Sequence, residues 1–587
     1  MKTRTWMATS LAWLLLATAC GGGDRGMAPE NREAPDWILV GGTVLTGEDD
    51  APRAEALAVK DGRIVGVGPR ARIEAMAGPA TRLEELPGHV VVPGLVDAHG
   101  HVLGLGFSLR RVDLRGVETY AGLIRRAADQ AAEQERGSWI LGRGWDQSLW
   151  EGRSFPHHRD LSAAVPHHPV LLTRVDGHAA LANEVSLLRA GINRDTPDPP
   201  GGRILHDADG MPTGVLIDNA IGLVEVHVTA PSHAEQLEAL DLAVHHLAAL
   251  GLTGVHDAGV GYYPSLGWDD PQDPGWGMVE LYRELLAAGR LPIRVYVMLG
   301  GNGAYPDQEA YFARPQVLGE GNGMITVRAI KLGVDGALGS RGAALEEPYA
   351  DQPETRGLLL RDQKTLDGLM SRAFAGGWQV AVHAIGDRAN RMVLDAVEKA
   401  RREHPAIADP RPRMEHAQVL RPVDIPRFAP LGVIASVQPT HATSDQPWAA
   451  ARLGQERLQG AYAYGSLAAA GARLACGSDF PVENANPLAG LQAAVARTDA
   501  QGMPKGGWRL QEALSPAAAL ACFTTGPAYA AFMEDETGRL AVGMRADLTI
   551  LDGDPLTVNG GALSDLKAVR TVVGGRTVYQ APSPHDS

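Results

Sequence analysis

An apolar run that ends in two histidines is the most informative stretch of this chain: His89-Val-Val-Val-Pro-Gly-Leu-Val-Asp-Ala-His-Gly-His101. Its three consecutive valines are typical of a buried strand. In a β-strand, side chains two residues apart point the same way, so His99 and His101 can direct both imidazoles at one point beyond the strand end. Imidazole is a common ligand of zinc and other first-row metals. The stretch therefore predicts a strand that carries a metal site.

Short apolar runs alternate with helical stretches along most of the chain. The expected buried strands are 89–96, 138–141, 170–173, 254–256, 293–299, 326–331, 379–383, 433–437 and 473–476, and the expected helices are 121–135, 233–250, 279–288, 365–375, 390–404 and 487–497. Alternation of this kind favours an α/β fold with a parallel sheet. We expect one (β/α)8 TIM barrel over residues 91–526. A typical barrel needs only about 250 residues, so we also expect an insertion around 145–219. We interpret it as an elaborated loop region near the top of the barrel.

Composition excludes several classes of protein. The chain has 587 residues, of which 45% are hydrophobic and 21% charged, so a disordered chain is excluded. Its 54 Lys and Arg against 69 Asp and Glu leave a net charge of −15, which makes nucleic acid an unexpected partner. Only three cysteines are present, too few for a disulfide scaffold. Cys476 and Cys522 form no Cys-x-x-Cys pattern that could hold a structural zinc. They either pair in an oxidising compartment or remain two buried thiols.

The N-terminus has the organisation of a signal peptide. A short basic segment precedes a mostly apolar run, 6–16, which is shorter than the roughly 20 residues of a membrane-spanning helix. The small residues Ala17-Thr-Ala19 then precede Cys20, and this pattern resembles the lipobox of bacterial lipoproteins, whose cysteine is acylated. We expect removal of residues 1–19, a membrane anchor at Cys20 and a tether over 20–35. The protein would then be exported to the periplasmic or cell-surface side. An ordinary secretory signal with a chance cysteine is the alternative.

Seven further motifs follow the histidine pair. They are Asp176-Gly-His178, Pro200-Gly-Gly-Arg-Ile204, Met211-Pro-Thr-Gly-Val-Leu216, Lys331-Leu-Gly-Val-Asp-Gly-Ala-Leu-Gly-Ser-Arg341, His383-Ala-Ile-Gly-Asp-Arg-Ala389, Glu415-His-Ala-Gln418 and Gly477-Ser-Asp-Phe-Pro481. Together they resemble the family-3 amidohydrolases of the amidohydrolase superfamily, the group that includes N-substituted formamide deformylases. The resemblance implies an eightfold barrel, a composite β-sandwich built from residues 36–90 and 527–587, and one or two divalent metal ions at the strand C-termini.

The resemblance also implies the ligands of these metals. They are His99, His101, Lys331, His383, His416 and Asp479. An ammonium group cannot bind a cation, but a carbamate formed from Lys331 and carbon dioxide offers two oxygens that can bridge two metals. A carbamylated Lys331 is therefore implied, and its alternative is a lysine paired with Asp335 or a neighbouring carboxylate. The imidazole donors make zinc the expected metal.

The expected function is hydrolysis of a non-peptide, amide-like C–N bond in a small molecule. Bound metals lower the pKa of water toward about 7, which supplies hydroxide at neutral pH. Asp479 would orient or deprotonate this water and then pass the proton to the leaving nitrogen. His178 is the candidate donor to the tetrahedral oxyanion. We expect Trp145, Asp146 and Arg341 to shape the substrate pocket or its support.

Two other functions stay open from the sequence. One is a deaminase or cyclic-amide (imide) hydrolase of the same superfamily; mononuclear deaminases typically carry a catalytic glutamate three residues after the third histidine, where this chain has Gly386. The other is a catalytically inactive barrel that binds ligands as a surface lipoprotein. His256 also ends a strand and could support the ligands. The exact substrate and the formation of a homo-oligomer both stay open.

Overall fold

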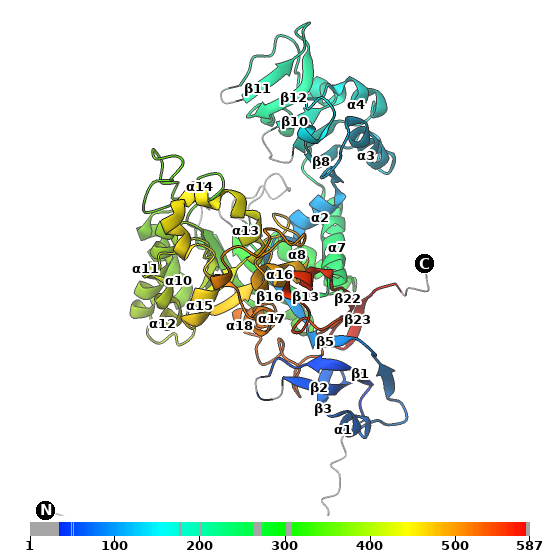
Figure 1. Ribbon diagram of the computed structural model, residues 1–587, viewed down its shortest axis with the longest axis vertical. Coiled ribbons are helices and arrows are strands. Elements are labelled where there is room, and N and C mark those ends of the chain that lie inside the picture. The colour runs from blue at the N-terminus through cyan, green and yellow to red at the C-terminus, as the bar shows by residue number, and fades with distance from the viewer. Residues whose placement is uncertain are drawn as a thin grey trace, which may run out of the picture.

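The computed structural model describes residues 34–582 apart from 49, 51, 175–178, 200–201, 262–272, 274 and 301–307. The predicted signal peptide, the predicted acylation site Cys20 and most of the predicted tether therefore lie outside the described residues. Within the described part of the chain, no helix is both long and apolar enough to cross a membrane. Figure 1 shows a central barrel with one sheet above it and another below.

The central body is the predicted barrel. Its eight strands run in the order β20-β19-β18-β17-β16-β14-β13-β6, and each neighbouring pair is parallel. In chain order they are β6 (Leu95–Gly100), β13 (Leu252–Ala258), β14 (Arg294–Gly300), β16 (Ile325–Gly333), β17 (Gln379–Ala384), β18 (Arg413–His416), β19 (Ile434–Val437) and β20 (Arg473–Cys476). The short β15 (Val317–Gly319) pairs with β16 outside this path. The predicted (β/α)8 fold is confirmed.

Helices follow the barrel strands along the chain. They are α2 (Val102–Arg110), α7 (His233–Ala249), α8 (Trp276–Ala287), α9 (Glu320–Gly323), α10 (Gln363–Ala375), α11 (Asp387–Glu403), α12 (Phe428–Leu431), α13 (Pro439–Ser444), α14 (Gln446–Arg457), α15 (Tyr464–Ala469), α16 (Pro487–Val495), α17 (Pro516–Cys522) and α18 (Thr525–Ala530). The six predicted helices are all present with small shifts at their ends; five are in this group, and 121–135 is α3 (Tyr120–Ala132) of the inserted unit. The start of α7 is set by a capping box, in which Ser232 and Glu235 bond each other's backbone amides.

The first and last barrel strands are joined by the loop that follows β20. The amide of Asp479 donates to the carbonyl of His99 (2.7 Å), and the amide of His101 donates to the carbonyl of Phe480 (2.8 Å). The buried carboxylate of Asp97 accepts from the Ser478 hydroxyl at 2.7 Å. This closure brings the histidine pair next to Asp479, although 378 residues separate Asp479 from His101 (479 − 101).

Both chain ends contribute strands to one composite sheet, where the sequence analysis expected a composite β-sandwich. Its strands hydrogen-bond in the order β23-β22-β21-β5-β1-β2-β3, with β4 beside β1. They are β1 (Trp37–Leu45), β2 (Arg53–Lys60), β3 (Arg63–Gly68), β4 (Arg82–Glu85), β5 (Val90–Pro93), β21 (Leu548–Leu551), β22 (Ala568–Val573) and β23 (Arg576–Gln580); α1 (Arg70–Glu74) follows β3. The sequence run 89–96 is therefore two strands. Gly94 separates them, and a Cβ there would lie 2.2 Å from Thr253 Oγ1.

The predicted insertion is a folded unit rather than a loop region, and it begins earlier than expected. Its six-stranded sheet has the order β11-β12-β10-β9-β8-β7. The elements are β7 (Val112–Asp113), α3 (Tyr120–Ala132), β8 (Ile140–Trp145), α4 (His158–Ala164), β9 (Val170–Arg174), β10 (Ala179–Ala182), α5 (Glu184–Arg189), β11 (Gly202–His206), β12 (Pro212–Asp218) and α6 (Gly222–Glu225). Two apolar runs, 138–141 and 170–173, belong to this sheet and not to the barrel. The unit buries its own apolar clusters and stands at the top of Figure 1.

Cys476 and Cys522 are joined by a disulfide, which resolves the alternative left open by their spacing. The bond connects the end of β20 to the end of α17, 46 residues later. Both residues are buried in the main core. The disulfide therefore attaches the last barrel strand to the helices that follow it.

Candidate metal centre

All six predicted ligands lie at or just beyond the C-terminal ends of barrel strands, where barrel enzymes place their active sites. His99 is in β6, His101 follows that strand, Lys331 is in β16, His383 in β17, His416 ends β18, and Asp479 follows β20. His99 is fully buried, whereas the His101 side chain is 28% exposed. The site therefore extends from the barrel interior to its mouth.

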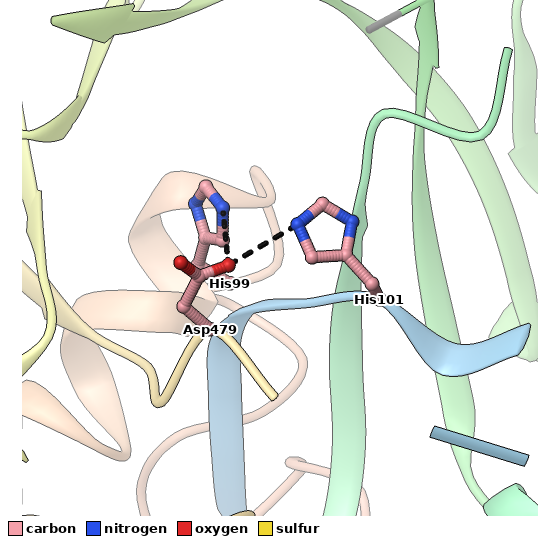
Figure 2. Close-up of side chains that lie close together, drawn as sticks. All are labelled: His99, His101 and Asp479. Carbon is pink, nitrogen blue, oxygen red and sulfur yellow. Dashed lines mark ion pairs between the residues drawn. The ribbon is translucent and has the colours of Figure 1, made fainter. Parts of the chain in front are cut away.

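Asp479 lies between the two histidines of the first motif (Figure 2). Its Oδ1 is 3.1 Å from His101 Nε2 and 3.5 Å from His99 Nε2. Burial alone would raise the pKa of Asp479, but the His101 hydrogen bond and the neighbouring imidazoles lower it well below its usual range. Asp479 is therefore an ionised carboxylate beside two imidazoles, an arrangement able to hold a cation.

A second group at the same site contains a histidine that the sequence analysis missed. Ligand atoms of His416, His441 and Asp479 all lie within 4.8 Å of one another. His441 lies in α13, four residues after β19 ends. Its position just beyond the apolar run 433–437 could have identified His441 as a strand-end residue. The sequence analysis missed it because Thr-His-Ala matches none of the motifs that identified the other predicted ligands.

His383 and Lys331 complete the predicted set beside these two groups. The His383 and His416 rings lie 4.5 Å apart between centroids, and His383 Nε2 is 3.7 Å from Asp335 Oδ1. Lys331 is 1% exposed, and burial lowers the pKa of its amine. Within the described residues Asp335 forms no ion pair with Lys331; its carboxylate instead accepts the amides of Ala344, Ile385 and Gly386 at 2.8–3.0 Å.

Unpaired imidazole nitrogens show that this donor set fits a metal ion. His99 Nε2, His441 Nε2 and both ring nitrogens of His383 are buried without a hydrogen-bond partner in the described part of the chain. Buried polar atoms are normally satisfied because an unpaired one is costly. Burial lowers the pKa of His99 to about 4 and that of His383 to about 3, so both imidazoles are neutral and offer a lone pair. Neutral imidazoles and a carboxylate are donors that suit zinc.

A buried charged network lies beneath His99. Its Nδ1 donates to Glu415 Oε2 at 2.5 Å, so Nε2 is left to face the site. Arg413 holds the other oxygen of Glu415 at 2.7 Å and also donates to His256 Nδ1 at 2.8 Å. His256 is thus in the layer that supports the ligands, as the sequence suggested. His416 is oriented in the same way, because its Nδ1 donates to Gln438 Oε1 at 2.8 Å.

The other predicted site residues lie outside this cluster. Trp145 is fully buried in the inserted unit, where its Nε1 donates to the Leu172 carbonyl at 2.7 Å. Asp146 accepts from Arg174 at 2.7 Å. Arg341 follows β16 and pairs with Asp351 at 2.8 Å. Contact of these three residues with substrate stays a prediction. His178 lies outside the described residues.

Comparisons with known proteins identify the family of this chain. The sequence profile of the amidohydrolase family matches residues 82–579. YtcJ of Bacillus subtilis (strain 168), named as an amidohydrolase, is 35% identical over 544 residues, covering 92% of this chain and 99% of that protein. The N-substituted formamide deformylase of Arthrobacter pascens is 29% identical over 561 residues, covering 93% of this chain and 98% of that protein.

A solved structure gives the same result at the level of the fold. An uncharacterized metal-dependent hydrolase from Pyrococcus furiosus superposes with a TM-score of 0.71 at 30% identity, covering 89% of this chain and all of that one. The family profile spans the barrel and part of the composite sheet, from β4 to β23, and histidine and aspartate donors converge at the barrel mouth. This chain is therefore a member of the amidohydrolase family, within the metal-dependent amidohydrolase superfamily.

Proposed function

We propose that this amidohydrolase hydrolyses a non-peptide, amide-like C–N bond of a small molecule, with Asp479 as general acid and base. The observation that supports this most is the ionised Asp479 carboxylate among unpaired imidazoles at the barrel mouth. The relative named as an N-substituted formamide deformylase supports an amide-like substrate, since it matches nearly the whole chain.

His99, His101, Lys331, His383, His416 and Asp479 would hold one or two divalent ions, with zinc the expected metal. Such an ion supplies Lewis acidity to the scissile carbonyl and lowers the pKa of water. Lys331 would take part as a carbamate: in its unprotonated form Nζ attacks carbon dioxide, an N–C bond forms as one C–O π bond breaks, and the nitrogen loses one proton to solvent. The surroundings of Nζ suit this reaction, because Lys331 is buried and has no ion pair with Asp335 in the described residues.

Asp479 handles the protons in this proposal. Its carboxylate accepts a proton from the attacking water and passes it to the nitrogen of the leaving amine, so one residue serves both steps. His101 touches Asp479 Oδ1 and holds the carboxylate in place. We further propose that His178 donates a hydrogen bond to the tetrahedral oxyanion.

The test is Asp479→Asn in the zinc-loaded protein, assayed against N-formyl amines, N-acyl amino acids, cyclic imides and lactones. We expect kcat on the best substrate to fall by about 10²–10⁴-fold, the usual contribution of a general acid or base. Zinc content is measured alongside, because Asp479 is also a proposed ligand. Unchanged turnover in Asp479→Asn would show that the catalytic assignment is wrong.

The same substrate panel separates the alternatives. Turnover confined to cyclic imides would favour the cyclic-amide hydrolase, and no turnover by fully zinc-loaded protein would favour the ligand-binding barrel. The deaminase has less support, because no acidic side chain fits at Gly386: a Cβ there would lie 1.9 Å from the Ala344 carbonyl oxygen.

We also propose that the protein is exported and anchored to a membrane through acylated Cys20, on the periplasmic or cell-surface side. The signal-like residues 1–19 support this, and the Cys476–Cys522 disulfide suits an oxidising compartment. The intact mass of membrane-extracted protein should include the acyl groups, whereas Cys20→Ser should appear in the soluble fraction. Equal membrane association of both forms would contradict the anchor.

A further inference from the structure

His441 has no part in the predicted ligand set, yet the fold brings it to the site. It lies in α13, which begins two residues after the end of β19. In barrel enzymes the segments after strand C-termini carry the catalytic groups. His441 is 9% exposed, so its imidazole belongs to the interior of the site rather than to the protein surface.

The Nε2 atom of His441 lacks a hydrogen-bond partner among the described residues. Its neighbour is Asp479 Oδ2, 3.7 Å away. A hydrogen bond needs a separation of roughly 2.7–3.2 Å, so this contact is too long to be one. Two donors that bind one zinc ion, each about 2.1 Å from it, can lie up to about 4 Å apart. The separation therefore suits a cation shared by the two atoms better than a direct contact.

His416 provides a second nitrogen donor beside His441. Because its Nδ1 donates to Gln438 Oε1 at 2.8 Å, its Nε2 keeps the lone pair that can bind a cation. The His416 and His441 rings are stacked with centroids 6.0 Å apart. Gln438 and His441 come from the same turn after β19, so this turn orients one donor and supplies another.

The two oxygens of Asp479 face different groups. Oδ1 lies near His99 and His101, at 3.5 and 3.1 Å, whereas Oδ2 lies near His441 at 3.7 Å. A carboxylate placed in this way can bridge two cations, one on each side. The structure thus offers a bridging group in addition to the carbamate proposed at Lys331.

We propose that His441 is a ligand of a second divalent cation, which it binds together with His416 and Oδ2 of Asp479. The inference rests on the proposed function, since it concerns the metals of the same site. Two imidazoles and one carboxylate make zinc or another first-row divalent ion the expected occupant.

The experiment is a metal titration of the full chain. The protein is stripped with a chelator and reloaded with Zn²⁺, and bound zinc is counted by mass spectrometry after dialysis. Wild type should retain about two equivalents and His441→Ala about one. Binding of the second equivalent should weaken at least about tenfold, because loss of a residue that only supports a ligand already costs 10–100-fold. When Co²⁺ is titrated instead, the second equivalent should add visible absorption in wild type but not in His441→Ala.

Two variants make the test specific. Thr440→Ala changes the buried neighbour of His441 in the same helix without removing a nitrogen donor, so it should keep two equivalents. His441→Glu restores a ligand atom and should regain the second cation. Two equivalents of unchanged affinity in His441→Ala would overturn the proposal, as would equal zinc loss in Thr440→Ala.

Metal content is measured without substrate, so failure of the two proposals can be told apart. If no compound of the panel is hydrolysed but His441→Ala loses one zinc ion, the proposed function is wrong and the assignment of His441 as a metal ligand is upheld. If His441→Ala keeps two zinc ions but loses turnover, the hydrolase stands and the ligand assignment is wrong.

Discussion

At the scale of single residues, Glu415 determines which nitrogen of His99 faces the metal site. Burial alone would raise the pKa of Glu415, but Arg413 and His99 lower it well below its usual range, so the carboxylate is ionised. It accepts from His99 Nδ1 at 2.5 Å and from the Ser436 hydroxyl at 2.6 Å. The proton of His99 therefore stays on Nδ1, and Nε2 is free to bind.

Replacing Glu415 by glutamine should weaken zinc binding by about 10–100-fold, the usual cost of losing a group that orients a ligand. The measurement is competition with a chelator of known affinity. Because Arg413 also loses its counter-charge, the melting temperature is recorded for each variant. Ser436→Ala is the matched control: it removes one hydrogen bond to the same carboxylate and one from Arg413, each worth about 1 kcal/mol, and keeps both charges. Wild-type affinity in folded Glu415→Gln would contradict the role of Glu415.

At the scale of secondary structure, the inserted unit is carried by the pair of helices α2 and α7. The chain leaves the barrel at the end of α2 and returns at the start of α7 (Figure 1). The two helices pack closely at Gly106, where an added Cβ would lie 2.0 Å from the Ala239 carbonyl oxygen. The absence of a side chain at Gly106 therefore sets the distance between these helices.

Gly106→Ala should lower the free energy of unfolding by about 1–3 kcal/mol through overpacking, even though alanine is intrinsically the better helix former by about 1 kcal/mol. The control is Gly104→Ala in the same helix, where the nearest atom to the new Cβ is 3.5 Å away in Pro481. That variant should be at least as stable as wild type. Denaturant titration compares all three proteins, and a Gly106→Ala protein as stable as Gly104→Ala would contradict the close packing.

At the scale of the whole molecule, a buried ion pair joins the barrel to the composite sheet. Arg294 begins β14, and Asp547 precedes β21. The Arg294 guanidinium donates to both carboxylate oxygens, at 2.6 and 2.9 Å, and the Gly574 amide donates to the same carboxylate at 2.7 Å. One carboxylate thus connects a barrel strand to the C-terminal strands.

Asp547→Asn should therefore destabilise the protein by about 3–5 kcal/mol, because it leaves a buried guanidinium without its counter-charge. Asp554→Asn is the control. Its partner Arg53 is 44% exposed, and exposed pairs contribute only about 0–1 kcal/mol. Both variants are compared in thermal and denaturant unfolding. Equal stability of the two would show that the Arg294 pair does not hold the sheet to the barrel.

The sequence by itself determined the features that depend on local pattern. Alternating apolar runs and amphipathic stretches predict parallel strands and helices wherever they occur, and this identified the barrel. The family motifs indicated the site, and the strand-end positions of His99, His383 and His416 agree with them, because the C-terminal ends of parallel strands meet at one edge. The six helices were predicted from the composition of their own stretches, which are rich in Ala, Leu, Glu and Arg.

Only the tertiary structure decided which strands pair and which side chains meet. Runs 138–141 and 170–173 have the composition of barrel strands, but they pair within the inserted sheet. Cys476 and Cys522 pair because β20 and α17 end side by side. His441 reaches Asp479 only because the turn after β19 directs it there. Strand pairing and side-chain contacts join residues far apart in the chain, so no local periodicity encodes them.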